Sequence, residues 1–169
     1  MAASALDSDY VHILISKLKA NDPRNDLQFK NIVNFEREFD TFDMAKNLQT
    51  LRDYKPDLLV LRISENVTRT TDSVLFAQKY VEMLNYFRSG NPDIKILAVG
   101  SVWPDRDMAE KVLRKNSTYI SLAPMQNDMS NYAFGLFTDP GVASHPSNKG
   151  MKYIADSIWG GAIKLIPDL

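Results

Sequence analysis

The sequence predicts an α/β fold in which helices pack around a mostly parallel sheet. Short apolar runs of strand length alternate along the chain with stretches in which apolar residues recur every three or four positions. The composition agrees, because 44% of the 169 residues are apolar and 24% are charged, as in a globular protein. At this length we expect a single domain over residues 1–169.

The first third of the chain predicts two helices and two strands. Apolar residues recur at helical spacing from Leu6 to Leu18. The run KNIVNF, residues 30–35, is short and β-branched, which predicts a strand, and helical spacing returns from Met44 to Leu51. Next comes KPDLLVLRI, residues 55–63, a nearly continuous apolar run that suits a parallel strand covered on both faces.

The middle of the chain repeats this alternation. A long helix is predicted from about Thr71 to Arg88, with Val74, Ala77, Val81 and Leu84 on its buried face. The run IKILAVG predicts a third strand, and TYISL, residues 118–122, a weaker fourth. Between these two strands, Pro104 and Asp105 open a helix that continues through Val112.

An irregular segment and a final helix complete the chain. Residues 123–148 are rich in turn-forming residues, and a loop of this length is a common place for functional residues. Apolar residues then return at helical spacing from Met151 to Ala162. In a parallel sheet, ligands bind beyond the carboxyl ends of the strands, so we expect site residues to gather there.

Charge and residue usage exclude several classes of function. The net charge is −1 and the basic residues are scattered among acidic ones, which disfavours nucleic acid as a partner. The chain has no cysteine, so disulfides, thiolate catalysis and zinc–thiolate sites are excluded. We find no apolar run of membrane-spanning length and no signal peptide, and we expect no membrane association. The compartment and the oligomeric state stay open.

Two residues are candidates for chemistry. Asn66 follows the strand of residues 55–63, where its amide could donate into the crevice or could hold a turn. His145 precedes Pro146, which extends the chain at the histidine, and Ser147 or Asn148 can then cap the last helix. His145 is therefore either a general base on a loop or a histidine at a helix start. We assign His12 to packing or to the surface.

These residues resemble two motifs of the SGNH/GDSL hydrolases, a family of esterases and acyl hydrolases. The stretch SENV places Asn66 in register with the asparagine of the family's Gly-x-Asn-Asp block, with Ser64 and Val67 in place of the glycine and the aspartate. The stretch VASHPSNKGM supplies His145, Pro146 and Gly150 of the block that reads Asp-x-x-His. The resemblance implies a three-layer, flavodoxin-like α/β/α sandwich, with Asn66 as oxyanion-hole donor and His145 as general base.

The chain departs from the family at the acid and at the oxyanion hole. Val142 stands where the family has aspartate and cannot orient an imidazole, so the acid is absent, replaced by a carbonyl, or supplied from elsewhere, for which Asp139 is the candidate. The family's glycine after the second strand is also missing. We expect a backbone N–H between Glu36 and Phe39 to substitute for it, with a side chain crowding the pocket.

The nucleophile is the largest departure. The family's Gly-Asp-Ser or Gly-Asn-Ser block is not in this chain, and MAASALDSDYVHIL reads as the segment that follows it. We therefore expect an N-terminally truncated chain that lacks the first strand. Ser4 is the nearest serine, but no strand precedes it to form a tight turn. Ser101 follows IKILAVG without an elbow motif, which favours a turn or a substrate contact.

The sequence therefore predicts an ester hydrolase acting on acylated carbohydrates or similar small esters. Asn66 and His145 should face one crevice at the carboxyl edge of the sheet, and the chain without its serine should be inactive. We expect no metal or organic cofactor, and the partner is a small-molecule or carbohydrate ester. The alternative is a non-catalytic binding or structural module, which the missing serine block, Val67 and Val142 support. A nucleotide or flavin binder is disfavoured because no glycine-rich phosphate loop follows a strand.

Overall fold

The computed structural model describes residues 3–68, 71–167 and 169, which divide into two compact units. We call residues 28–121 the sheet unit. The terminal unit comprises residues 3–27 together with residues 122–169. The expectation that residues 1–169 form one domain stays a prediction.

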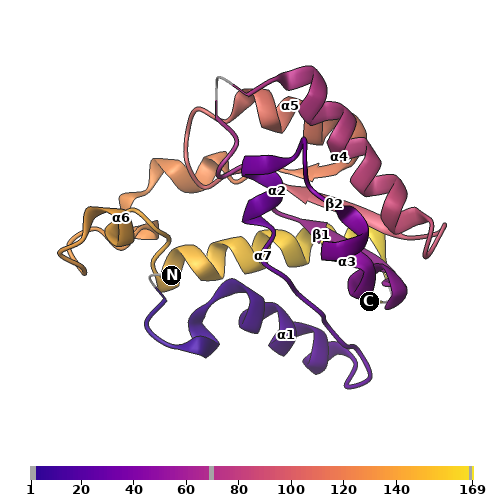
Figure 1. The fold of residues 1–169 in the computed structure, drawn as a ribbon. Helices are drawn as coiled ribbons and strands as arrows, with labels where there is room; N and C mark the ends of the chain where they lie inside the picture. Colours follow the sequence, from indigo (N-terminus) through magenta and orange to yellow (C-terminus); the bar gives the residue numbers. More distant parts are fainter. Residues whose placement is uncertain (1–2, 69–70, 168) are drawn as a thin grey trace. The chain divides into compact units, whose positions relative to one another are not determined.

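A parallel sheet lies at the centre of the sheet unit (Figure 1). Its three strands are β1 (Leu58–Leu61), β2 (Lys95–Val99) and β3 (Thr118–Ile120), in the order β1-β2-β3. Both pairings are parallel, with Leu59 opposite Ile96 in the first. The α/β class and the parallel sheet are thus confirmed.

Four helices accompany this sheet, and local sequence signals explain where three of them begin. They are α2 (Val33–Glu38), α3 (Met44–Asp53), α4 (Ser73–Arg88) and α5 (Asp107–Asn116). Asp43 and Asp72 cap α3 and α4, because each side chain accepts backbone N–H groups of the first turn. The expected helix at Pro104 and Asp105 begins later, at Asp107, because Asp105 adopts a left-handed conformation with φ of 66°.

The strand predicted at residues 30–35 is wrong, because the segment runs into α2 instead. The side chain of Asn31 accepts the N–H of Val33 at 2.9 Å, and the N–H of Phe35 donates to the Ile32 carbonyl at 2.8 Å. The helical turn that these bonds begin buries Phe35, whose ring lies 5.4 Å from that of Phe42. Burial of this aromatic ring outweighs the weak β propensity of the β-branched pair.

The core of the sheet unit lies between one face of the sheet and its helices. Alternate strand residues such as Leu61, Ile96 and Ala98 belong to this core. The stripe that α4 buries differs from the predicted one: Val74 is 66% exposed and lines a groove of about 1070 Å³ between α4 and α5. Of the predicted residues, Leu84 is buried as expected, and α4 also buries Phe76, Tyr80, Met83 and Phe87. Turning these three rings inward removes more apolar area from water than burying Val74 would.

Two long helices pack together in the terminal unit, α1 (Tyr10–Asn21) and α7 (Asn148–Leu165) (Figure 1). The helical spacing from residue 6 onward is interrupted at Asp9, which caps α1, so that Leu6–Ser8 form a separate short helix, η1. The predicted apolar face of α7 is confirmed, since Met151, Ile154, Ala155, Ile158 and Ala162 are buried.

The segment of residues 123–148 is less irregular than expected. It contains three short helices, η2 (Ala123–Asn127), η3 (Met129–Asn131) and α6 (Pro140–Ala143). Asp139 caps α6 by accepting the N–H of Val142 at 3.0 Å. The loop before α7 is therefore held by local hydrogen bonds.

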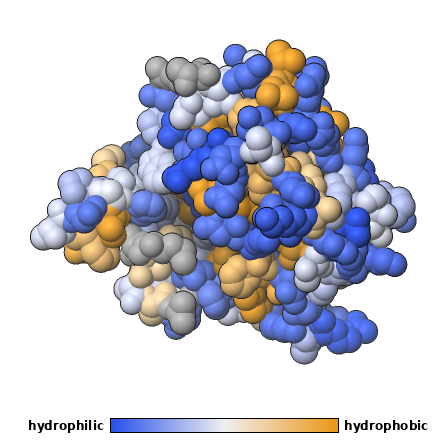
Figure 2. Space-filling view, viewed as in Figure 1, coloured by the Kyte–Doolittle hydropathy of each residue, from blue (hydrophilic) through white to orange (hydrophobic). Residues whose placement is uncertain are grey.

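The surface drawn in Figure 2 is mainly hydrophilic, as the share of charged residues leads one to expect. On the face drawn in Figure 2, hydrophilic residues predominate and apolar residues form small patches. No helix in the part of the chain that the structure describes is long and apolar enough to cross a membrane.

Candidate active site

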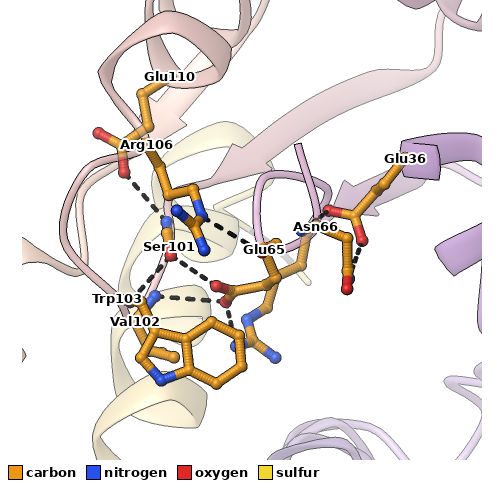
Figure 3. Close-up of polar contacts among 9 residues, drawn as sticks. Glu36, Glu65, Asn66, Ser101, Val102, Trp103, Arg106 and Glu110 are labelled. Atoms are coloured by element: carbon orange, nitrogen blue, oxygen red, sulfur yellow. Dashed lines mark hydrogen bonds and ion pairs between the residues drawn. The ribbon is translucent and has the colours of Figure 1, made fainter. Parts of the chain in front are cut away.

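Asn66 lies just beyond the carboxyl end of β1, as predicted, and α2 holds its side chain (Figure 3). The Nδ2 group donates to Glu36 Oε2 at 2.6 Å, and the backbone N–H of Asn66 lies 3.3 Å from Glu36 Oε1. An Arg37 guanidinium nitrogen donates to Asn66 Oδ1 at 3.1 Å. The side chain expected to crowd this position is thus Glu36. The expectation that a backbone N–H of residues 36–39 completes an oxyanion hole stays a prediction.

The carboxyl group of Glu36 is almost removed from solvent, since the residue is only 6% exposed. This burial raises the pKa of Glu36, and the nearby charge of Glu65 raises it further, while the two hydrogen bonds from Asn66 act in the opposite direction. The sequence indicated Glu36 only as the start of a segment that could supply a backbone N–H; a contact between its carboxyl group and Asn66, 30 positions away, could not be predicted.

Glu65 anchors the loop that carries Asn66, and the sequence analysis missed this residue too (Figure 3). Its carboxylate accepts the Ser101 hydroxyl and an Arg62 nitrogen, each at 2.5 Å, and the N–H of Val102 at 3.3 Å. Arg106 Nε donates to the Glu65 carbonyl at 3.2 Å. Glu65 lies a few residues after the carboxyl end of β1 at Leu61, where ligands bind in parallel sheets, and this position was the signal that the sequence offered.

Ser101 braces the turn after β2. Its hydroxyl donates to Glu65 and accepts the N–H of Trp103 at 2.8 Å, and its own N–H donates to Glu110 at 3.1 Å. The residue is fully buried. Ser101 was expected either to hold a turn or to contact substrate, and these contacts hold a turn.

The two replacements in the Asn66 block are both buried. Val67, in place of the family's aspartate, packs in the core of the sheet unit at 2% exposure. Ser64, in place of the glycine, is completely buried, and its hydroxyl has no hydrogen-bond partner among the described residues. Ser64 is thus enclosed, whereas Val67 also borders the groove between α4 and α5.

His145 lies in the terminal unit, between α6 and α7. Its Nδ1 is 2.6 Å from the carbonyl oxygen of Gly141, and its backbone N–H donates to the Val142 carbonyl at 3.0 Å. The carboxylate of Asp139 meanwhile caps α6. A carbonyl can only accept, so Nδ1 is the donor in this contact, and in a neutral imidazole the lone pair is then on Nε2. The role of Asp139 as acid stays a prediction.

A short antiparallel bridge holds the backbone around His145. Tyr132 pairs with Pro146, and the His145 carbonyl accepts the N–H of Ala133 at 2.9 Å. Ser147 caps α7 by accepting the N–H of Gly150, as predicted. The imidazole is therefore attached to a backbone that is fixed on both sides.

Gly150 is required by close packing. A Cβ atom at this position would lie 2.1 Å from the Asn131 carbonyl oxygen, 2.8 Å from Met125 Cε and 3.0 Å from Pro146 Cβ. The glycine of the histidine block therefore lets α7 approach the bridge that holds His145.

Gly150→Ala should lower the free energy of unfolding by about 1–3 kcal/mol, because the clash falls on a backbone oxygen that cannot move freely. Urea unfolding measures this change. Gly160→Ala on the same helix is the matched control, since a Cβ there meets nothing within 4 Å. The control should gain up to about 1 kcal/mol of stability from helix propensity. Equal stability changes in both variants would contradict the packing argument.

Ser4 and His12, the other two residues of the terminal unit considered for chemistry, make hydrogen bonds near the starts of helices. Ser4 and Asn148 exchange two hydrogen bonds, from the Ser4 N–H at 3.0 Å and from Asn148 Nδ2 at 2.6 Å. His12 Nδ1 lies 2.7 Å from Asp9 Oδ2. Asp9 is buried and also caps α1, whereas the His12 side chain is 38% exposed, so the pair fits the packing or surface role assigned to His12.

No group of three or more histidine and carboxylate residues within the described ranges could hold a metal ion. The sheet unit offers an amide donor held by a carboxylate and a guanidinium, and the terminal unit separately offers an imidazole whose Nδ1 contacts a carbonyl. The expectation of a reaction without metal or cofactor stays a prediction.

No family model matches the sequence, and the search of curated proteins found no similar one. Three solved structures are similar in fold. A carbohydrate esterase family 3 from Talaromyces cellulolyticus is 18% identical with a TM-score of 0.58, over 100% of this chain and 94% of that one. An acetyl esterase solved with acetate ion is 20% identical with a TM-score of 0.53, over 94% and 89%.

The third structure is a family two carbohydrate esterase from Clostridium thermocellum in complex with cellohexaose, 17% identical with a TM-score of 0.53. The match covers 75% of this chain, which spans only 39% of the length of that enzyme. All three are described as esterases. At these identities the likeness establishes the fold: the chain has an SGNH-like α/β fold, as the resemblance of its motifs predicted.

Proposed function

We propose that this chain is part of an SGNH-type ester hydrolase, in which His145 is the general base and Asn66 an oxyanion donor. The observation that carries the proposal is the SGNH-like fold combined with the contact between His145 Nδ1 and the Gly141 carbonyl. That contact selects the imidazole tautomer whose Nε2 can take a proton from a serine hydroxyl. In this proposal the Gly141 carbonyl accepts a hydrogen bond from His145 Nδ1 and so fixes the imidazole tautomer, as the aspartate does in the family.

The reaction needs a nucleophilic serine in addition to His145 and Asn66. In the complete site, the serine oxygen attacks the ester carbonyl while His145 takes its proton and later returns it to the leaving alcohol. The amide of Asn66 donates to the oxyanion of the tetrahedral intermediate. The proposal therefore includes a strand ending in Gly-Asp-Ser or Gly-Asn-Ser upstream of Met1, and a crevice in which Asn66 and His145 bracket one ester group.

Acylated carbohydrates are the proposed substrate class. Two of the similar structures are carbohydrate esterases, one of them in complex with cellohexaose, and the third is an acetyl esterase. The first test is the gene sequence before the codon for Met1. An in-frame Gly-Asp-Ser or Gly-Asn-Ser after an apolar strand supports the hydrolase, and a stop codon in its place contradicts it.

A non-catalytic binding module is the second candidate, and one contact favours it. Glu36 places a carboxylate against Asn66, where a negative charge opposes an oxyanion. Isothermal titration of this chain with acetylated and unacetylated cello-oligosaccharides separates the two functions. Tight binding of an unacetylated sugar by a chain with no upstream serine block would favour the module.

The chain of 169 residues by itself should hydrolyse p-nitrophenyl acetate no faster than buffer, because neither Ser4 nor Ser101 is a positioned nucleophile. Ser101 is buried and bound to Glu65, and Ser4 is paired with Asn148. Release of p-nitrophenolate measures the rate. Turnover that disappears in Ser4→Ala or in Ser101→Ala would identify a nucleophile that this interpretation misses.

A further inference from the structure

We propose that Glu36 and Arg37 of α2 are positioning residues that fix the Asn66 amide in one orientation, so that one Nδ2 hydrogen binds Glu36 and the other is left to donate to an oxyanion. The inference rests on the proposed function for the role of that second hydrogen. The orientation itself is independent of any activity.

The two charges around the amide select this orientation. The carboxylate of Glu36 accepts from Nδ2 at 2.6 Å, and the guanidinium of Arg37 donates to Oδ1 at 3.1 Å. If the amide turned over, Oδ1 would face the carboxylate and Nδ2 the guanidinium, and both contacts would become repulsive. Adjacent residues of one helix therefore determine which way the amide of Asn66 points.

The backbone of Asn66 is fixed as well, which leaves the amide little freedom. Its N–H lies 3.3 Å from Glu36 Oε1, so that one carboxyl group contacts both the backbone and the side chain. The preceding residue, Glu65, is tied to Ser101 and Val102 after β2 through its carboxylate. Such preorganised donors are what an oxyanion hole requires, because they need no rearrangement when charge develops.

The amide nitrogen of Asn66 carries two hydrogens, and Glu36 accepts a hydrogen bond from one of them. Asn66 is half-buried, whereas Glu36 is only 6% exposed. The hydrogen bound to Glu36 is therefore on the protected side of the amide. The second hydrogen is the one that a substrate can reach at the carboxyl end of β1.

Protonation of Glu36 should be visible at Asn66. Burial raises the pKa of Glu36, and the charged group that acts on it is Glu65 from the loop after β1, whereas Arg37 of α2 contacts Asn66 Oδ1. Above its pKa, Glu36 is ionised and makes the stronger, charge-assisted hydrogen bond to Nδ2. Below that pKa the bond weakens, so the side-chain amide signals of Asn66 should titrate with Glu36.

The experiment is a pH titration of the 169-residue chain, followed by the 15N–1H signals of the Asn66 side chain. We expect two well-separated hydrogens that move together with a midpoint above the usual pKa of glutamic acid. In Glu36→Gln the movement should disappear, and in Arg37→Met the two hydrogens should move toward equivalence, whereas Arg37→Lys should restore part of their separation. Glu38→Gln is the matched control, because Glu38 is exposed on the same helix. It should leave the titration unchanged.

If the Asn66 signals of the unmodified chain do not titrate, the proposal is wrong. This result does not depend on whether the variants fold. An equal effect of Glu38→Gln would overturn it too. In the extended protein with its serine, Glu36→Gln should lower kcat about tenfold or more with little change in KM, since the amide loses its position and not its substrate contacts. Active enzyme with unchanged kcat in that variant would refute the positioning role. Absence of any esterase activity would refute only the proposed function, because the titration requires no turnover.

Discussion

His145→Ala is expected to lower kcat by several orders of magnitude in the protein that carries this chain behind a strand ending in Gly-Asp-Ser or Gly-Asn-Ser. Without the imidazole, no group takes the proton of the attacking serine or returns it to the leaving alcohol, and triad histidines are worth losses of this size. The measurement is kcat on a panel of acetylated sugars and aryl esters. The expected loss is in kcat, because Nε2 acts on the reacting atoms.

His12→Ala is the matched control for this variant. His12 is the other histidine of the chain, and its Nδ1 contacts Asp9 at the start of α1. Its removal should leave kcat close to that of the unmodified protein. Unimpaired activity of His145→Ala would leave VASHPSNKGM as an ordinary helix start, with Ser147 as the cap of α7.

Asp139→Ala decides what orients His145. The structure pairs His145 Nδ1 with the Gly141 carbonyl and uses the Asp139 carboxylate to cap α6, so we expect kcat to stay within about tenfold of the unmodified value. A loss equal to that of His145→Ala would instead identify Asp139 as the acid. Circular dichroism of the variant shows whether the loss of the cap has unfolded the segment.

Asn66→Ala should lower kcat in the same protein on the order of 10²–10³-fold, which is the usual effect of removing one oxyanion donor. The alanine cannot donate to the tetrahedral intermediate, and it also leaves the buried carboxyl of Glu36 without its closest partner. Some loss of stability should therefore accompany the loss of rate. Steady-state kinetics on an acetylated sugar, together with a urea unfolding curve, separates the two effects.

Asn34→Ala provides the comparison for that variant, because Asn34 is exposed on α2, two residues before Glu36. It should change neither kcat nor stability noticeably. A folded Asn66→Ala protein that keeps more than about a tenth of its kcat would contradict the role of Asn66 as oxyanion donor.

Patterns within a few residues determined much of this fold. The α/β class, the strands after residues 55 and 94, and the helices α3, α4 and α7 follow from apolar spacing and from caps such as Asp72 and Ser147. These signals are local, since spacing and capping involve residues no more than one or two helical turns apart. The positions of Asn66 at a strand end and of His145 before a helix could be predicted for the same reason.

Only the tertiary structure decided the features that depend on distant residues. Residues 30–35 form the start of α2 and not a strand, because Phe35 is buried against the rings of Phe42 and Phe76. The carboxylate beside Asn66 comes from a helix 30 positions earlier, and the Ser101 hydroxyl reaches Glu65 across 36 positions. Spacing along the chain cannot show such contacts, because they form only when β1 and β2 pair and bring their loops to the same edge of the sheet.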